Sequence, residues 1–540
     1  MTVRHKGLYE GTTERFIEQL IENPPPIVGM DIETISLKER QPIGFGIATS
    51  PYEAWYFVAY PEQDKEIDLI KALLLNPKIK KVFHNAIFDL RNFPLIGEID
   101  TTNIADTNVM ARLLTRTHTK LLELAPEVGM VATSAGDLMG PGQTMLDVDT
   151  DTVALKCMND CCVTLALYNK YYDKINPEYL DVEMKAIPIL IDMSLVGLKV
   201  NQEDRAREEI IIRKDVEYYK QVCTEEDFNP GSPQQVGYIL AKRGNFLPFT
   251  KGSRGKTRKA LRTDESTLEF LDDPLAMAVL SYRKAQKLLG TYIMPLADED
   301  RIYTEYNLDA VVGRISSSKR NLQNIPQNKR YIFMPDSGCY TTGDFSQEHL
   351  RILMHMSGDR EMQRVFYEGA EDGDIHIKTA KGLNVSRKLA KTINYAIPYG
   401  ATAKTISAQA KIRDIRRCSK FIDDWFRTYP DAAEWIRGAQ SYGLSHGVAL
   451  PTLFGREIGL QMDEYEEDIK RKAVNYPILG SDGEVMKRAL IICHSHDLPM
   501  VVTMHDSITC DGDVEFPIEE LESITPFNCP FVVNKTERWD

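Results

Sequence analysis

Carboxylates at short spacing form the first candidate site of this chain. Asp31 and Glu33 stand two residues apart in the apolar run IVGMDIET, so both side chains project from one side of an expected strand. Asp89 and Asp160 follow in the segments NAIFD and DCCVT. A pair of surface acids is the commoner explanation of a single Asp-x-Glu. Three acidic segments at distances that fit one domain instead favour a site for divalent cations.

A second acidic group lies in the other half of the chain. Asp344 follows the strand-like run CYTTG, and Asp506 lies at the turn of LPMVVTMHDSITCDG, which has the pattern of strand, turn and strand. Two aspartates of this kind can hold metal ions for phosphoryl transfer. The order of the two acidic groups therefore indicates one enzyme with two phosphoryl-transfer sites.

A basic helical segment lies between the second pair of acids. In RKLAKTINYAIPYG, basic and aromatic residues recur at every fourth position, on one face of the expected helix: Arg387, Lys391, Tyr395 and Tyr399. Pro398 and Gly400 predict the end of this helix, and the proline disfavours helical geometry at Ile397. An ordinary basic amphipathic helix is the alternative for this segment taken alone.

Size and charge limit the class of protein. A chain of 540 residues exceeds one ordinary core, so we expect two or more domains. A formal net charge of −14 argues against a protein that coats DNA indiscriminately, because such binding depends on neutralising phosphates. Residues 251–262, KGSRGKTRKALR, carry six basic side chains around two glycines and suit a loop that tracks a phosphate backbone. A solvated linker explains that segment equally well.

Targeting signals and zinc-binding cysteines are not expected. The N-terminal MTVRHKGLYEGTTERF lacks an apolar signal region, and no run of about 18 apolar residues occurs, so we predict neither export nor membrane insertion. Nine cysteines are scattered without zinc spacing. The closest group, Cys157, Cys161 and Cys162, has no matching histidine pair, so we expect reduced thiols and a cytoplasmic protein.

The N-terminal third resembles the proofreading 3′-5′ exonuclease domain of family A DNA polymerases. The basis is the three acidic segments, with apolar runs and helical spacing typical of an α/β domain over residues 1–176. The resemblance implies an RNase H-like fold in which four carboxylates hold two divalent ions, Mg²⁺ or Mn²⁺: Asp31, Glu33, Asp89 and Asp160. The family has a tyrosine four residues before its last aspartate. This chain has Lys156 there, so we expect a functional exonuclease with an altered rate.

The rest of the chain resembles the polymerase part of the same family. GRISSSKRNLQNIP, GDFSQEHLRILMHMSGD and the basic helix occur in the family's order. The resemblance implies a right-hand polymerase and a multidomain fold of the α/β and α+β classes. We predict a thumb with connecting helices at 177–300, a palm at 301–355 and 467–540, and fingers at 356–466. Asp344 and Asp506 are expected to bring two Mg²⁺ ions to the primer 3′ hydroxyl and the nucleotide α-phosphate.

Further contacts are implied by the same resemblance. The incoming nucleotide is expected to meet the basic helix and two histidines: Arg387, Lys391, Tyr395, Tyr399, His376 and His349. Cationic side chains can neutralise triphosphate oxygens, and an aromatic ring can stack on the base or sugar. The primed template is expected to meet polar residues of two segments: Arg314, Asn321, Gln323, Asn324, Arg471 and Asn475. Such contacts follow duplex shape, so sequence-specific binding is not expected.

Three positions depart from the family's pattern. Ser507 replaces the glutamate that commonly follows the second aspartate, so we expect weaker metal affinity without loss of activity. His349 replaces the glutamate that excludes a ribose 2′ hydroxyl, and Glu348 lies one residue early. An imidazole can block that hydroxyl or donate a hydrogen bond to it, so both outcomes stay open. Tyr395, where many relatives have phenylalanine, implies tolerance of dideoxynucleotides.

The resemblance therefore implies a template-dependent DNA polymerase with 3′-5′ proofreading. Its partners are primed template DNA and deoxynucleoside triphosphates, and we expect a monomer, with replisome partners left open. A 5′ nuclease domain has no room before Asp31, so the layout resembles phage replicative enzymes, although bacterial or organellar origin stays open. One alternative is a 3′ exonuclease whose polymerase-like part only holds duplex DNA, suggested by Ser507 and His349. A nucleic-acid-binding scaffold is another, and the two acid sets argue against it.

Overall fold

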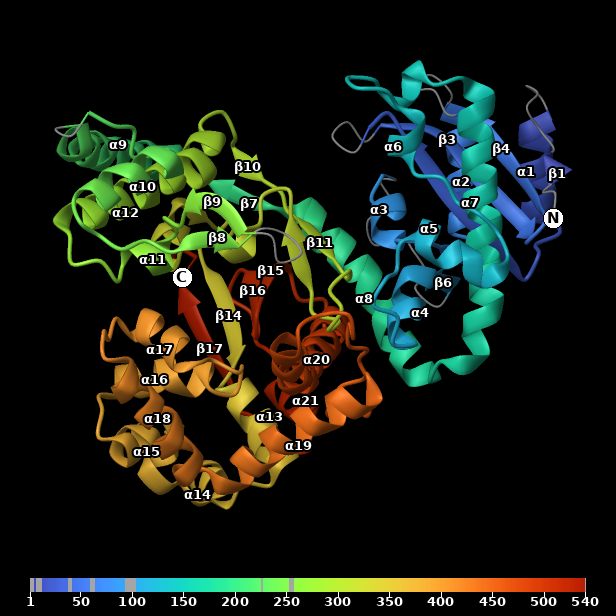
Figure 1. Ribbon diagram of the computed structural model, residues 1–540. Coiled ribbons are helices and arrows are strands. Elements are labelled where there is room, and N and C mark those ends of the chain that lie inside the picture. Colours follow the sequence, from blue (N-terminus) through green and yellow to red (C-terminus); the bar gives the residue numbers. More distant parts are fainter. Residues whose placement is uncertain are drawn as a thin grey trace.

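The computed structural model describes residues 4–5, 12–36, 41–58, 64–92, 103–224, 227–251 and 257–539. Figure 1 shows an N-terminal part, coloured blue to teal, beside a larger C-terminal part, coloured green to red. Each part has a β-sheet of its own, which agrees with the multidomain α/β and α+β class. Within the described ranges, no helix is both long and apolar enough to cross a membrane. All nine cysteines are free thiols.

The N-terminal part is built on a six-stranded sheet in the order β1-β4-β3-β2-β5-β6. Its strands are β1 (Arg4–His5), β2 (Ile27–Thr34), β3 (Pro42–Ser50), β4 (Glu53–Val58), β5 (Lys80–Phe83) and β6 (Ile104–Asp106). Its helices are α1 (Thr12–Glu22), α2 (Asp64–Leu74), α3 (Ala86–Leu90), α4 (Thr107–Leu113), α5 (Leu121–Leu124), α6 (Ala135–Leu138) and α7 (Thr150–Tyr171). The central strand β2 is the predicted strand IVGMDIET, antiparallel to β3 and parallel to β5.

Helix α7 packs very closely on this sheet because two glycines face it. A Cβ added at Gly46 would lie 2.5 Å from Cys161 Sγ, and one added at Gly29 would lie 2.5 Å from the Cys161 carbonyl oxygen. Both distances are far below van der Waals contact, so only glycine fits at these strand positions. The close approach places the acidic residue Asp160 of α7 beside the end of β2.

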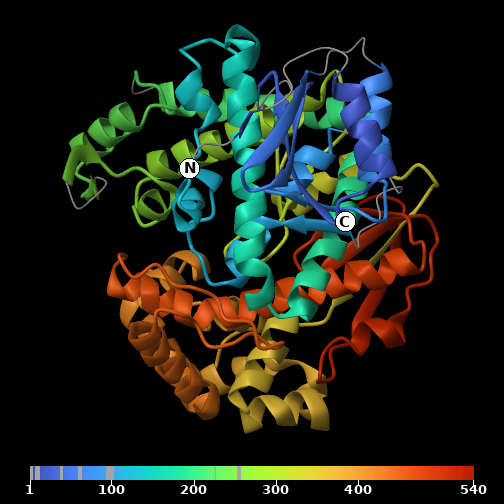
Figure 2. The same cartoon turned by 90° about the vertical axis from the view of Figure 1, so that its right-hand side faces the viewer.

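Helix α8 (Pro177–Val196) joins the two parts and begins at the boundary predicted near Pro177. The Tyr179 hydroxyl donates to the Phe454 carbonyl oxygen at 2.6 Å. Further along α8, Glu183 forms a buried ion pair with Lys487 of the C-terminal part. These contacts fix α8 against the C-terminal part, and in both Figure 1 and Figure 2 the blue sheet stands above the orange helices.

The segment predicted as the thumb is mainly helical. It contains α9 (Gln202–Thr224), α10 (Pro233–Lys242), α11 (Glu265–Leu268) and α12 (Pro274–Lys287), with a hairpin of β8 (Phe249–Lys251) and β9 (Thr257–Leu261). Small buried residues such as Ala276 and Val279 form a separate core here. The middle of the basic segment 251–262, residues 252–256, lies outside the described residues. Its described end belongs to the hairpin, so a mobile DNA-tracking loop stays a prediction.

A four-stranded antiparallel sheet forms the centre of the C-terminal part. Its order is β15-β16-β14-β17, from β14 (Tyr340–Phe345), β15 (Met500–Met504), β16 (Ser507–Asp511) and β17 (Phe531–Thr536). The strand, turn and strand predicted around Asp506 are β15 and β16. Shorter strands are β7 (Leu198–Val200), β10 (Arg301–Ile302), β11 (Glu305–Asn307), β12 (Ser316–Ser318) and β13 (Phe333–Met334).

Helices fill the long interval between β14 and β15, as predicted. They are α13 (Glu348–Ser357), α14 (Arg360–Glu368), α15 (Ile375–Leu383), α16 (Arg387–Ala396), α17 (Ala403–Ala410), α18 (Ile415–Thr428), α19 (Pro430–His446) and α20 (Glu466–Ser495). A short helix α21 (Ile518–Glu522) precedes β17. Buried Trp425 and Tyr429 pack together at the centre of α15, α16 and α18. This packing holds α16 against α15, which presents the basic helix next to the sheet.

Candidate active sites

The structure brings the four predicted acids of the N-terminal part together. Asp31 and Glu33 lie at the end of β2, Asp89 on α3 and Asp160 on α7. Asp31 Oδ2, Asp89 Oδ2 and Asp160 Oδ1 are buried and have no hydrogen-bond partner. Buried carboxylate oxygens without a partner are costly, and a bound cation would satisfy them. This donor set fits a hard divalent ion.

The charges of these acids are only partly balanced. Burial raises the pKa of Asp31 well above its usual range, and Glu33 and Asp160 add to this rise, while Lys156 opposes it. Burial likewise raises the pKa of Asp89, with a further contribution from Asp31. Carboxyls shifted in this direction indicate a shortage of positive charge in the site.

Lys156 is the cation that these acids contact. Its Nζ lies 2.6 Å from Glu33 Oε1 and 2.9 Å from Asp160 Oδ2. Burial alone would lower the pKa of Lys156, but the charges of Asp160, Asp31 and Glu33 outweigh it and raise that pKa well above the usual range. The lysine that departs from the family's pattern is therefore a charged member of this site.

Cys157 also lies within the acidic group, where it was not predicted. A ligand atom of Cys157 lies within 4.8 Å of ligand atoms of Asp31 and Glu33. However, burial raises the pKa of Cys157 well above its usual value, and its thiol points to the Asp31 carbonyl oxygen at 3.6 Å. A protonated thiol is a poor metal ligand, so Cys157 acts in packing.

Asp106 positions Asp89 and was not predicted. The Asp106 carboxylate accepts the backbone N–H groups of Asn85 at 3.1 Å and Ala86 at 2.8 Å, at the start of α3. It also caps α4 by accepting from Asn108 N at 2.8 Å. Its local signal is an Asp that precedes a helix, which is typical of a capping residue. Asp106 thus holds the short helix that carries Asp89.

The second pair of acids lies at two adjacent strands of the C-terminal sheet, one on β14 and the other directly before β16. Asp344 is on β14 and pairs in register with Ser507 of β16. Asp506 lies in the tight link between β15 and β16, and its carbonyl oxygen accepts from Phe345 N at 3.1 Å. Burial, followed by the charge of Asp506, raises the pKa of Asp344 to about 7. Two crowded carboxylates of this kind are suited to share divalent ions.

The basic helix lies beside these acids. Ser386 caps α16, and Lys391 lies close enough to lower the pKa of Asp344 against the effect of burial. Arg387 is tied to Asp374 at 2.6 Å. The helix ends at Ala396, as Pro398 predicted, but Ile397 keeps helical angles, with φ −64 and ψ −47. The expectation of non-helical geometry at Ile397 was wrong, because this residue can close the last turn through its N–H.

His376 has a defined tautomer. Trp425 Nε1 and the Thr379 hydroxyl both donate to Asn394 Oδ1 at 2.9 Å, which fixes the orientation of that amide. Asn394 Nδ2 therefore donates to His376 Nδ1 at 2.9 Å. Burial lowers the pKa of His376 to about 4, so the ring is neutral near pH 7. Its proton must then lie on Nε2, which is a hydrogen-bond donor.

His349 is held by a residue that the sequence did not point to. The Tyr399 hydroxyl lies 2.5 Å from His349 Nδ1, and Asp482 Oδ1 lies 3.3 Å from His349 Nε2. Asp482 is buried on α20 and also contacts Arg314 Nε at 2.6 Å through Oδ2. The signal that could have identified Asp482 is an acidic residue on an otherwise apolar helix face. Glu348 is fully buried, and burial and then the charge of Asp482 raise its pKa well above the usual range.

The residues predicted to contact DNA fall into two places. Arg314 and Gln323 line one cavity of about 160 Å³ together with Asp482 and His505. Asn321 accepts from the Ser317 hydroxyl at 2.8 Å at the start of the same short turn, where Asn324 is exposed.

The other two predicted DNA contacts lie one turn apart on α20. Arg471 is exposed and contacts Asp468 at 3.0 Å. Asn475 is buried, and its Oδ1 has no hydrogen-bond partner. Such a group is available to a ligand that reaches it.

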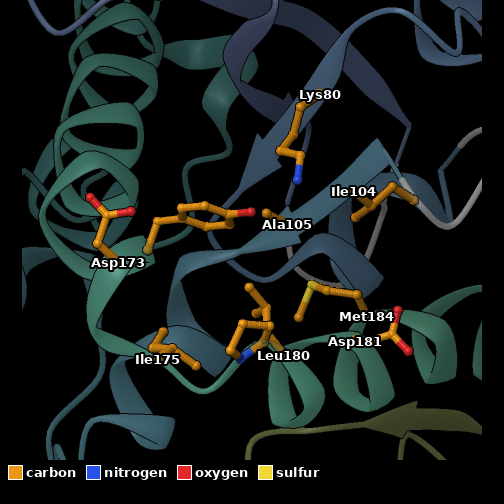
Figure 3. A pocket seen from close by; sticks show the side chains of 10 residues that line it. Lys80, Ile104, Ala105, Asp173, Ile175, Leu180, Asp181 and Met184 are labelled. Atoms are coloured by element: carbon orange, nitrogen blue, oxygen red, sulfur yellow. The ribbon is translucent and has the colours of Figure 1, made fainter.

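A larger pocket of about 380 Å³ lies apart from both acidic groups. Figure 3 shows Lys80 reaching into it from β5, with Leu180 and Met184 of α8 along its other side. Lys80 Nζ lies 5.3 Å from the ring centroid of Tyr172, a cation–π contact. None of the predicted site residues lines this pocket, so it belongs to neither of the two acidic sites.

Comparison with known families agrees with these two acidic sites. The model described as DNA polymerase family A matches residues 201–526, and the model described as 3′-5′ exonuclease matches residues 10–176. The chain belongs to DNA polymerase family A. The two matches confirm the predicted order, in which an exonuclease domain precedes the family A polymerase domain.

Two relatives of this family A chain come from bacteria. It is similar to DNA polymerase I of Chloroflexus aurantiacus, with 29% identity over 87% of this chain and 55% of that protein. It is also similar to DNA polymerase I of Synechocystis sp., with 28% identity over 92% of this chain and 57% of that protein. The chain thus spans somewhat over half the length of these relatives.

A solved structure shares the fold of the family A chain. It is the polymerase domain of Pol1 from M. smegmatis, in complex with a DNA primer-template and a dNTP. The TM-score is 0.80, the alignment covers 99% of both chains, and the sequence identity is 20%. The likeness extends over the exonuclease and polymerase domains alike.

Proposed function

We propose that this chain is a template-dependent DNA polymerase that extends primed DNA with deoxynucleoside triphosphates and proofreads through its exonuclease domain. The observation that carries the proposal is the placement of Asp344 on β14 and of Asp506 directly before the adjacent strand β16, with Lys391 of α16 close to Asp344. Paired carboxylates next to a cationic helix suit the transfer of a nucleotide from a triphosphate. Membership of family A supports the same reaction.

In the polymerase site, the side chains of the fingers segment would hold the triphosphate. Arg387 and Lys391 offer positive charge, and His376 offers the Nε2 proton without a charge of its own. Asp344 and Asp506 would hold divalent ions that lower the pKa of the primer 3′ hydroxyl and balance the charge of the leaving pyrophosphate. Tyr395, whose ring lies 5.7 Å from that of His376, is placed to stack on the nucleotide.

In the exonuclease site, the acids would act on the terminal phosphodiester of the primer. A water oxygen bonds to phosphorus, the bond from phosphorus to the 3′ oxygen breaks, and that oxygen takes a proton. Bound metal would activate the water and neutralise the leaving oxygen. Asp31 and Asp89 supply open carboxylate oxygens for this purpose.

The finer details are part of the proposal. We assign Mg²⁺ to both sites, with Mn²⁺ as a substitute, because every ligand is a carboxylate oxygen. Arg314, Asn321, Gln323, Asn324, Arg471 and Asn475 are assigned to the primed template. Free cysteines and bacterial relatives support a protein that works in the cytoplasm, and we assign it as a monomer.

Primer extension tests the proposal. A labelled primer on a longer template is incubated with Mg²⁺ and four deoxynucleotides, using the unaltered chain, Asp506→Asn and Asp31→Ala. Asp513→Asn is the matched control, since Asp513 is an exposed aspartate of the same region that pairs only with Lys535 on the surface among its described contacts. We expect template-length products in all samples except Asp506→Asn, and primer shortening without nucleotides in all except Asp31→Ala.

Two outcomes would contradict the proposal. Shortening without extension by the unaltered chain would leave an exonuclease whose polymerase domain only holds DNA. DNA binding without any Mg²⁺-dependent turnover would instead indicate a scaffold.

A further inference from the structure

Lys156 occupies the space between two of the four exonuclease acids. Its Nζ contacts Glu33 Oε1 at 2.6 Å and Asp160 Oδ2 at 2.9 Å, and only 12% of the side chain is exposed. These are the distances of strong charge-assisted hydrogen bonds. The lysine therefore joins a strand residue to a helix residue, as a bridging metal ion would.

A divalent ion and this ammonium group cannot share that space. An ion bound to both oxygens would lie about 2.1 Å from each, inside the contact distance of Nζ. Lys156 leaves other carboxylate oxygens of the site open. Asp31 Oδ2 and Asp89 Oδ2 are buried without a partner, as is the second oxygen of Asp160.

Charge balance leads to the same arrangement. Four carboxylates carry four negative charges, which two divalent ions alone would neutralise. With the buried ammonium in place, a second divalent ion would bring an excess of positive charge into a poorly solvated site. One lysine and one divalent ion leave the site with a small net negative charge. A counterion from the solvent can balance that charge.

We propose that Lys156 takes the place of one of the two divalent ions, so that this exonuclease site binds a single divalent ion between Asp31 and Asp89. Glu33 and Asp160 are then held by the lysine and position the ion's carboxylates. This inference rests on the proposed exonuclease function. It makes Lys156 a positioning and charge-balancing residue, since an ammonium group has no vacant coordination position for water.

The number of bound Mn²⁺ ions tests directly whether the exonuclease site holds one divalent ion or two. The full chain carries Asp344→Asn and Asp506→Asn, which remove the polymerase ligands, and bound Mn²⁺ is counted by electron paramagnetic resonance. We expect one tightly bound Mn²⁺ with Lys156 and two after Lys156→Met. Lys170→Met is the matched control, because Lys170 lies on the same helix and pairs with Glu127 at 3.3 Å, away from the acids. It should leave the count at one.

A second pair of variants keeps the test valid if Lys156→Met does not fold. With Lys156 in place, Asp89→Asn should weaken Mn²⁺ binding by at least roughly 100-fold, whereas Glu33→Gln should weaken it by less than about 10-fold. Two bound Mn²⁺ ions with Lys156 in place, or equal losses in Glu33→Gln and Asp89→Asn, would overturn the inference while leaving an exonuclease. No bound Mn²⁺ at all would overturn the exonuclease function as well.

Discussion

Asp482 Oδ1 lies 3.3 Å from Nε2 of His349. The other ring nitrogen of His349 faces the Tyr399 hydroxyl at 2.5 Å, so both nitrogens of this imidazole face protein groups. The hydroxyl contact holds the ring through Nδ1, while Nε2 faces the Asp482 carboxylate without a hydrogen bond, so the bulk of the ring remains in the way of a ribose 2′ hydroxyl. Of the two outcomes that the sequence left open at position 349, the geometry favours exclusion of ribonucleotides.

Removing the His349 ring, or the Asp482 carboxylate that it faces, should therefore weaken the discrimination between deoxyribose and ribose nucleotides. We expect His349→Ala to lower the ratio of kcat/KM for dNTP over rNTP, and Asp482→Ala to lower it by roughly 10-fold through loss of the held ring. Single-nucleotide incorporation gives both constants. Glu484→Gln is the control, since this buried acid of the same helix pairs with Arg456 at 3.1 Å. An unchanged ratio in folded Asp482→Ala would refute the role of Asp482.

The polymerase site should lose metal affinity below neutral pH. Burial and the charge of Asp506 raise the pKa of Asp344 to about 7, so the proton stays on this carboxyl until the pH rises through that value. Because a proton competes with the ion, the Mg²⁺ concentration for half-maximal extension should rise as pH is lowered from about 8 to about 6. Extra Mg²⁺ should restore part of the rate. A half-saturating concentration that is constant with pH would count against this account.

Tyr395 should permit dideoxynucleotide incorporation. A phenolic hydroxyl near the sugar can replace the hydrogen bond of a missing 3′ hydroxyl, and such a bond is worth about 1 kcal/mol or more. We expect Tyr395→Phe to increase the preference for dNTP over ddNTP by about 10-fold, without a large change in dNTP incorporation. Chain-termination assays with mixed nucleotides measure this. A strong preference for dNTP in the unaltered chain would argue against it.

The buried ion pair between α8 and α20 should be important for stability. Lys487 on α20 and Glu183 on α8 are both buried, so Lys487→Met removes the ion-pair partner of an interior carboxylate and leaves it only the charges of Arg456 and Arg112. We expect a loss of about 3–5 kcal/mol in the unfolding free energy, measured by urea denaturation. The double variant Lys487→Met with Glu183→Leu should recover much of this loss. A single variant as stable as the parent would show that the carboxylate finds another partner.

Features with a local pattern could be predicted from the sequence. The strand with Asp31 and Glu33, the turn with Asp506 and the end of the basic helix at Pro398 each depend on neighbouring residues. The structural effects of alternating apolar residues and of proline extend over only a few positions, so a short stretch of sequence is enough to predict them. Asp89 was predicted to lie with the other acids, where the structure places it, although α3 that carries it was not foreseen.

Features that depend on distant residues could not be predicted. Asp482 meets His349 across more than a hundred residues, and no periodicity connects the two positions. Strand β17 was missed because its pairing with β14 closes the sheet from the far end of the chain. The position of Lys156 required the close packing of α7 on Gly46, which only the folded sheet reveals.

The contacts of α8 bear on how a mismatched primer end would reach the exonuclease site. Together with the ion pair of Arg91 and Glu305 at 3.3 Å and the Arg112 contact to the Ala310 carbonyl oxygen at 3.1 Å, they hold the N-terminal part against the C-terminal part. The two acidic sites then keep a constant separation, which a primer end would cross only by fraying from its template. Each base-pair step that opens costs about 1.4 kcal/mol, close to a tenfold fall in population. A mismatch has already lost part of that stacking. The DNA itself, through its ease of melting, would then decide which ends are trimmed.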